Sequence, residues 1–208
     1  MKKTMLKMFL PLFVLASCAV FAGQTNGFIL ESAAVKGKAE TGFFTKLVSV
    51  GRLDAAYAAK DGDPLNTRSF PIAWKGLPSG TKCLALVFDD PDAKPVMQAY
   101  GMKGDAFLHW TAADIDPSFG ALADNASVKN PSFSQGKNGG GTNGYVGPRP
   151  PADFPKGMKK PLVHIYRLTV YALSAKIGLK EGFSLEELQR AMKGKVLAQS
   201  QLFVSYSN

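Results

Sequence analysis

The most continuous apolar segment beyond the N-terminal region spans residues 81–89 and ends abruptly at Asp90-Pro91. Ser79-Gly80 precedes it, so turn-forming residues bound the segment on both sides. A run of this length without polar alternation is typical of a strand that is covered on both faces. The segment therefore predicts a central strand in a sheet with layers packed on either side.

Other segments place the chain in the mostly β class. Residues 107–112 and 164–173 have the aromatic and β-branched character of strands, and residues 42–75 alternate short apolar pieces with turn residues. Residues 131–155 are rich in glycine and proline, which excludes a helix and predicts a long irregular loop. Long ordered loops often carry function.

The helical signals gather near the C-terminus. Ser184 and Glu187 form a capping-box pattern ahead of a helical apolar pattern, and Gly194 is suited to end that helix. Residues 196–202 predict a second short helix, and residues 203–206 predict a last strand. We find no internal repeat, so we expect a mostly β protein with a few peripheral helices near its C-terminus.

Residues 1–22 have the three-part plan of a secretory signal, with lysines first, then an apolar run, then small residues. We therefore expect an exported protein of the bacterial periplasm, with residues 23–208 as a single domain. Cleavage after Ala22 is favoured and gives a soluble product. The alternative is a lipobox that ends at Cys18, whose cysteine would carry a lipid anchor.

Cys83 is left without an intramolecular partner under either cleavage, because Cys18 is lost or lipidated. No disulfide framework is therefore expected. Cys83 stands in the apolar run, where a cysteine behaves as a small buried hydrophobe rather than as a reactive thiol.

The positive charge of the chain is moderate. The net charge is +9, and it falls to +6 when the three lysines of residues 1–22 are removed. The excess forms no strong basic stripe beyond the lysines of residues 156–160, which are typical of a solvated loop. We therefore expect no nucleic-acid binding, although this basic loop could touch anionic lipid headgroups.

Four polar side chains are predicted to converge at one end of the sheet. The only two histidines, His109 and His164, each stand in a predicted strand, and His164 shares a strand face with Tyr166. Asp90 emerges where the apolar face of the central strand ends, in an acid turn with Asp92 just beyond. A carboxylate, two imidazoles and a phenol could then line one pocket.

The glycine-rich loop offers a second candidate feature. Gly139, Gly141 and Gly144 formally satisfy G-x-G-x-x-G, but prolines follow where the dinucleotide fingerprint needs a helix, so nucleotide binding is not expected. A glycine loop stiffened by proline can still point unpaired backbone N–H groups at an anion. Residues 136–151 are therefore a candidate anion-binding loop.

The chain contains four motifs in the same order as the phosphatidylethanolamine-binding proteins, and it resembles this family and, within it, the bacterial Raf-kinase-inhibitor-like branch. The motifs are the Asp-Pro-Asp-Ala turn at residues 90–93, the His109-Trp110 pair, the loop at residues 144–151 and the His-x-Tyr strand at residues 164–166. The resemblance covers roughly residues 43–206. It implies a β-sandwich with peripheral helices and a small anion pocket at one end, which binds phosphate or a phosphorylated headgroup.

Carried over by position, the family's pocket implies a non-catalytic binding site with neither metal nor cofactor. The implied ligand-binding residues are Asp90, Asp92, His109, Gly147, Pro148, His164 and Tyr166. Three departures leave the floor of the pocket intact and change its rim. Lys94 stands where the family has proline, Ile165 replaces an arginine, and residues 152–163 form a longer connection than usual.

Two other classes of function stay open on the sequence alone. One is a protein-interaction module, with a protease or a signalling protein as its partner, and a monomer and a homodimer are equally open. The other is a hydrolase in which Asp90, His109 and His164 hold a metal or act as acid and base. Neither a G-x-S-x-G elbow nor an H-E-x-x-H motif occurs, which favours the binding protein.

The residue types also predict a pH dependence for the binding function. A protonated histidine and a tyrosine hydroxyl can donate to phosphate oxygens, and Asp90 nearby favours the imidazolium. We predict that phosphate-type ligands bind more tightly as the pH falls from about 7.5 to 6, a range set by the ordinary pKa of histidine.

Overall fold

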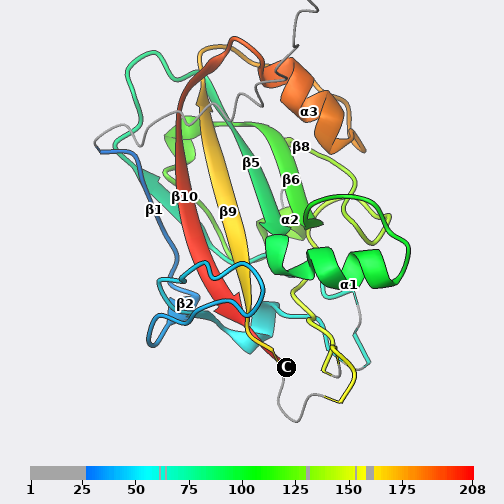
Figure 1. The fold of residues 1–208 in the computed structure, drawn as a ribbon. Helices are drawn as coiled ribbons and strands as arrows, with labels where there is room; N and C mark the ends of the chain where they lie inside the picture. The colour runs from blue at the N-terminus through cyan, green and yellow to red at the C-terminus, as the bar shows by residue number, and fades with distance from the viewer. Residues whose placement is uncertain (1–26, 61, 64, 130–131, 153, 158–161) are drawn as a thin grey trace, which may run out of the picture.

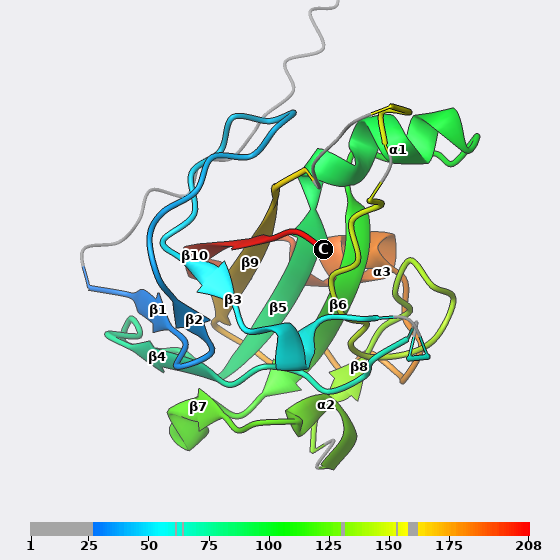
Figure 2. The same ribbon diagram turned by 90° about the horizontal axis from the view of Figure 1, so that it is seen from below.

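The structure, a computed structural model, describes residues 27–60, 62–63, 65–129, 132–152, 154–157 and 162–208. Strands dominate, and they form two sheets that pack face to face with short helices around them (Figure 1; Figure 2). The predicted β-sandwich with peripheral helices is therefore confirmed. The predicted export signal, including Cys18, lies outside the described residues. No helix within the described part of the chain is long and apolar enough to cross a membrane.

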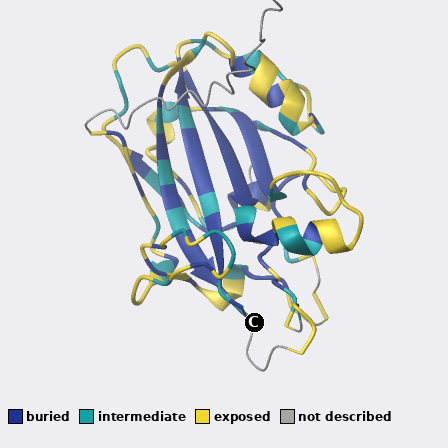
Figure 3. Cartoon of the chain, in the orientation of Figure 1, coloured by how far each residue is buried: buried dark blue, intermediate teal, exposed yellow. Residues whose placement is uncertain are grey.

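The larger sheet has seven strands in the order β2-β3-β10-β9-β5-β6-β8. Its neighbours pair antiparallel, apart from the parallel pair β3 and β10. The strands are β2 (Val35–Lys36), β3 (Arg52–Leu53), β5 (Cys83–Asp90), β6 (Phe107–Ile115), β8 (Ser134–Gln135), β9 (His164–Leu173) and β10 (Val196–Tyr206). All eight residues of β5 are buried, as predicted for a strand covered on both faces (Figure 3).

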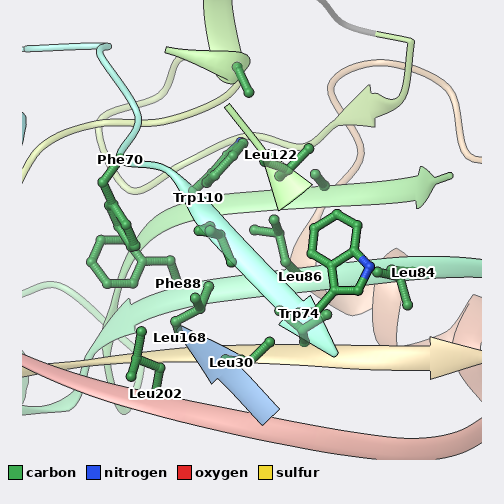
Figure 4. Packing of buried hydrophobic residues seen from close by; sticks show 14 of the residues in the cluster. Leu30, Phe70, Trp74, Leu84, Leu86, Phe88, Trp110, Leu122, Leu168 and Leu202 are labelled. Carbon is green, nitrogen blue, oxygen red and sulfur yellow. The ribbon is translucent and has the colours of Figure 1, made fainter. Parts of the chain in front are cut away.

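The smaller sheet covers one face of the larger one. Its strands, in the order β1-β4-β7, are β1 (Ile29–Glu31), β4 (Ile72–Lys75) and β7 (Ala121–Leu122). The main core fills the space between the sheets (Figure 4), where Leu84, Leu86 and Phe88 of β5 belong to the same cluster as Leu30 and Trp74 of the smaller sheet. Each fully buried side chain of this kind stabilises the fold by roughly 1.5–3 kcal/mol.

The opposite face of the larger sheet is covered by α3 (Leu185–Met192). Cys83, Ala85 and Val87, which alternate along β5 with the residues of the main core, pack there against α3 residues. The predicted capping box at Ser184 and Glu187 is present at the start of this helix. Because successive residues of a strand point to opposite faces, one strand supplies both cores.

Other helical segments occur earlier in the chain than the sequence predicted. They are η1 (Ala55–Tyr57), η2 (Pro91–Ala93), α1 (Lys94–Ala99), η3 (Pro117–Phe119) and α2 (Ala126–Lys129). The predicted irregular loop within residues 131–155 is confirmed for its described part, where only the short β8 interrupts it.

The predicted helix at residues 196–202 is wrong, because this segment is the first part of β10. Buried and partly exposed residues alternate from Ala198 to Val204, which is the period of a strand. β10 also pairs with β9 along its whole length. Long-range pairing with β9 therefore determined the secondary structure of a segment whose local pattern was ambiguous. The predicted strand at residues 203–206 is confirmed as the last part of β10.

Candidate ligand-binding site

Asp90 and His164 meet because they end and begin two neighbouring antiparallel strands. Asp90 is the last residue of β5, and His164 is the first residue of β9. Nδ1 of His164 lies 2.8 Å from Oδ2 of Asp90, and both side chains are buried. A carboxylate only accepts, so Nδ1 of His164 carries the hydrogen of this bond.

The second oxygen of Asp90 holds the acid turn. Oδ1 accepts the backbone N–H of Ala93 at 3.0 Å and so caps η2. Pro91 occupies the first position of that turn, where its fixed φ suits a helical start. The carboxylate of Asp90 is therefore committed to two partners, the imidazole and the turn.

His109 reaches the same region through a β-bulge in β6. Phe88 pairs with Trp110 and Asp89 pairs with Leu108, so His109 is an extra residue between two registered pairs. Bulges re-aim side chains and are frequent beside functional sites. Here the His109 ring lies against the rings of Phe88 and Tyr166, which belong to the same core cluster as Trp110.

The hydrogen bond of His109 sets its tautomer. Nδ1 lies 2.8 Å from the carbonyl oxygen of Val146, which can only accept, so Nδ1 donates. Nε2 makes no hydrogen bond to any residue that the structure describes. Burial lowers the pKa of His109 below its ordinary value, against the opposing effects of Asp90 and of the Val146 carbonyl. The neutral ring, with Nε2 as an acceptor, is therefore favoured in the free protein.

Tyr166 lies between the two histidines. Its ring centroid is 5.2 Å from that of His109 and 6.4 Å from that of His164. Its hydroxyl is buried and has no hydrogen-bond partner among the described residues. Burial raises the pKa of Tyr166 well above its ordinary value, and the charge of Asp90 adds to the increase, although no well-formed hydrogen bond joins the two groups. Buried polar atoms are rarely left unpaired, so this hydroxyl calls for an explanation.

A hollow of about 240 Å³ opens beside this cluster. His109 and Gly147 are part of its lining, whereas Asp90, His164 and Tyr166 are not. The structure thus brings the four predicted side chains together, but only one of them reaches the hollow. The Tyr166 ring packs against His109, His164 packs against Tyr166 and pairs with Asp90, and these three residues are almost completely buried.

Of the predicted Gly147-Pro148 wall, Gly147 lines the hollow and Pro148 does not. A side chain at Gly147 would collide with the backbone of Ala59 and Tyr57, at 2.5 and 2.7 Å from its Cβ. The Gly147 N–H donates to the carbonyl of Asn66, and the Pro148 carbonyl accepts from Ala59, each at 2.9 Å. The wall is therefore fixed by two hydrogen bonds to the segment before β4.

The prediction that the glycine loop points free N–H groups at an anion is wrong for the glycines of the loop. The backbone N–H of every glycine in it donates within the protein, mostly to backbone carbonyls. These glycines are Gly136, Gly139, Gly140, Gly141, Gly144 and Gly147. The loop instead folds around Asn138, whose amide oxygen accepts from Gly140 and Thr142.

Asp92 is not part of the lining of the hollow. Its carboxylate accepts from the backbone of Phe44 at 2.9 Å, from the backbone of Thr45 at 2.6 Å and from the hydroxyl of Thr45 at 3.1 Å. It also accepts the N–H of Ile165 at 2.8 Å. Four donors occupy this carboxylate, so Asp92 joins the segment before β3 to the start of β9, and its predicted contact with a ligand stays untested.

The rim residues singled out by sequence have local partners. Lys94 pairs with Asp105 at 2.7 Å on the surface, and Ile165 is fully buried. The 152–163 connection falls partly outside the described residues. Sequence reasoning missed the apolar lining contributed by α1 and the turn after it, although Met97 and Tyr100 have the three-residue spacing of one helix face.

Two further candidate features of the sequence are the thiol of Cys83 and a possible metal site. Cys83 is buried, and burial raises the pKa of its thiol to about 12. Within the described ranges, no group of three or more His, Cys, Asp or Glu side chains is placed to hold a metal ion.

Comparison with known proteins identifies the family. The model of the phosphatidylethanolamine-binding protein family matches residues 45–207. The uncharacterized protein YxkA of Bacillus subtilis is 38% identical over 155 residues, which cover 69% of this chain and 82% of the relative. A UPF0098 protein of Methanothermobacter thermautotrophicus is 34% identical over 159 residues, which cover 75% and 91%. The chain belongs to the phosphatidylethanolamine-binding protein family.

Solved structures agree with this assignment. A phosphatidylethanolamine-binding protein homolog from Chlamydia trachomatis superposes with a TM-score of 0.65 at 26% identity, covering 88% of this chain and 99% of that one. YbcL of E. coli, described as a member of the same family, gives a TM-score of 0.66 at 24% identity, covering 87% and 98%. The second likeness is evidence of the fold alone.

Proposed function

We propose that this chain is a non-catalytic binding protein whose site, formed by His109, Tyr166, His164 and Asp90, takes a small phosphate-type anion or a phosphorylated headgroup. The observation that carries the proposal is the buried Tyr166 hydroxyl, which has no hydrogen-bond partner among the described residues. The Nε2 atoms of the two neighbouring imidazoles also have none among those residues. Such a set of unused polar atoms, of which the His109 ring borders a hollow, suits a ligand with several oxygens.

The tautomers of the two histidines determine how the site can bind an anion. In the neutral state the Nε2 atoms of His109 and His164 are acceptors, because each Nδ1 donates within the protein. Protonation of His109 turns its Nε2 into a charged donor, the stronger kind of hydrogen bond. An anion beside the ring favours that protonation, so binding takes up a proton and strengthens as the pH falls.

A calorimetric titration tests the proposal. Sulfate and methylphosphonate are the probes. Sulfate keeps its charge over this pH range, so any pH dependence of its affinity comes from a titrating group of the protein. We expect the affinity for sulfate to rise between about pH 7.5 and 6, by at most roughly tenfold per pH unit for one linked proton. Absence of binding, or a flat pH profile, contradicts the proposal.

His109→Asn is the informative variant, because the shorter amide can still donate to the Val146 carbonyl while nothing replaces Nε2. We expect it to weaken binding by about 10- to 100-fold, the equivalent of one charge-assisted hydrogen bond. Lys75→Gln is the control, since it removes a positive charge that pairs with Glu31 on the surface of the smaller sheet. Hydrolysis of p-nitrophenyl phosphate by the wild type would instead favour the acid–base alternative.

We also propose that the mature chain acts in the periplasm, with the first 22 residues as its export signal. Mass spectrometry of the purified N-terminus tests this, because cleavage after Ala22 and lipidation at Cys18 give different masses. An intact N-terminus would contradict both forms of export.

A further inference from the structure

The hollow beside His109 has an apolar wall that an inorganic anion does not use. Val96 and Met97 lie in α1, and Tyr100 and Met102 follow it, beside the ends of β5 and β6 (Figure 1). Phe107 at the start of β6 adds a further apolar side chain. Tetrahedral oxyanions gain nothing from such surroundings, so the wall indicates a ligand with an apolar part.

Large apolar side chains also gather at the mouth of this hollow. Tyr100 is 74% exposed, Leu65 is 45% exposed and Met102 is 42% exposed, and all three belong to the lining. Single exposed hydrophobes are ordinary, but several around one hollow mark a binding surface.

The charges of the lining favour an anion. The basic side chains of the lining are those of His109 and Arg149, and the lining contains no Asp or Glu among the described residues. The hollow thus combines apolar walls with the imidazole of His109, which suits an anion that carries an apolar group.

The size of the hollow limits the apolar part to about one ring. A buried cavity of about 150 Å³ holds one benzene, and this hollow measures about 240 Å³. The two acyl chains of a phospholipid would have to lie outside it. Methionine and aromatic walls favour an aromatic guest, because both sulfur and ring edges make favourable contacts with a ring.

We propose that the hollow binds the ring of a small aryl phosphate or aryl phosphonate whose acidic group is held at His109. The inference rests on the proposed function and names its ligand class. The ring would lie among Met97, Tyr100, Met102 and Phe107, and the acid would reach the Nε2 atom of His109.

Two matched ligands separate this inference from the function on which it rests. Phenylphosphonate and methylphosphonate share an acidic group and differ in the ring, and both are titrated calorimetrically into the purified protein. We expect phenylphosphonate to bind about 10- to 100-fold more tightly, as burial of one ring predicts. Equal affinities would overturn the inference and leave the proposed function standing, whereas no binding of either ligand would overturn both.

Val96→Phe tests where the ring lies, because the larger side chain fills part of the hollow. We expect this variant to lose most of the advantage of phenylphosphonate and to keep its affinity for methylphosphonate. Val128→Phe is the matched control, on α2 and outside the hollow, at a valine that is 55% exposed. Tyr100→Ser changes a highly exposed side chain and serves as a second variant whose folding is not at risk. An advantage that survives both Val96→Phe and Tyr100→Ser would overturn the inference.

Discussion

Nδ1 of His164 lies 2.8 Å from Oδ2 of Asp90, and the two side chains retain only 2% and 4% of their accessible surface. The other oxygen of the same carboxylate accepts the N–H of Ala93, in the turn that leads into α1. One buried carboxylate therefore positions an imidazole of the candidate site and also the helix α1, which lines the hollow. The polar and apolar halves of the site share this anchor.

Asp90→Asn should reverse the tautomer of His164. Asparagine can keep the bond to Ala93 through its oxygen, which turns its NH₂ group toward the ring. Nδ1 must then accept, and Nε2 must carry the hydrogen. The imidazole ¹⁵N chemical shifts report this directly, and we expect the variant to be less stable by roughly 1–3 kcal/mol. Wild-type imidazole shifts in the variant would contradict the assigned pairing.

Tyr166→Phe should leave the free protein as stable as the wild type, within about 1 kcal/mol, because the hydroxyl it removes has no partner in the described structure. Tyr145→Phe is the matched control, since the buried Tyr145 hydroxyl donates to the Tyr57 carbonyl at 2.7 Å. That variant should lose about 1 kcal/mol or more. Urea unfolding measures both changes.

The same pair of variants should show the opposite order in ligand binding. Removal of the Tyr166 hydroxyl takes away a donor to the anion, so we expect about 10-fold weaker sulfate binding. Tyr145→Phe should bind as the wild type does. Loss of stability in Tyr166→Phe without loss of affinity would show that the hydroxyl serves the fold and not a ligand.

The stability of the free protein should fall as the pH decreases through the range where histidine titrates. Burial places the pKa of His109 in the folded protein below its ordinary value. As the pH drops below about 6.5, the unfolded chain takes up this proton first, so the free energy of unfolding decreases, by at most about 1.4 kcal/mol per pH unit. Above that range both states are neutral and the contribution is absent.

Urea unfolding at about pH 7.5, 6.5 and 5.5 in the wild type and in His109→Asn measures this effect. The variant lacks the titrating group, so its stability should depend less on pH over this interval. Saturating sulfate should also reduce the acid-induced loss in the wild type, because the bound anion favours the protonated ring. Identical pH profiles for the two proteins would contradict the assignment to His109.

The sequence could predict the parts of the site that depend on strand periodicity. Alternation placed His164 and Tyr166 on one face of β9, and the end of the apolar run placed Asp90 at the edge of β5. The structure has both arrangements. These predictions succeeded because a period of two fixes the direction of each side chain once the strand is known.

The position of His109 could not be derived in the same way. Its direction depends on a bulge, and a bulge exists only relative to the register of the partner strand. The hollow was missed for a similar reason, because α1 becomes a wall only where the chain returns against β6 and the glycine loop. Both features arise from pairing between segments that are distant in the sequence.

Asp92 was predicted to contact the ligand, whereas its hydrogen bonds indicate a role in the stability of the fold. A substitution can separate these two roles. Asp92 accepts from Phe44, Thr45 and Ile165, residues that lie at least 47 positions away in the sequence. Asp92→Asn places an NH₂ group against some of these donors, so we expect a loss of at least about 3 kcal/mol in the free energy of unfolding and faster hydrogen exchange at Thr45 and Ile165.

Asp116→Asn is the control for Asp92→Asn, because Asp116 caps η3 through a bond to the N–H of Ser118 and asparagine caps about as well. It should change stability by only a few tenths of a kcal/mol. For the folded fraction of Asp92→Asn, sulfate affinity should fall less than it does in His109→Asn. If Asp92→Asn cost more free energy of sulfate binding than free energy of unfolding, Asp92 would belong among the ligand contacts. A carboxylate that only joins two segments should affect the stability of the fold more than the affinity for a ligand.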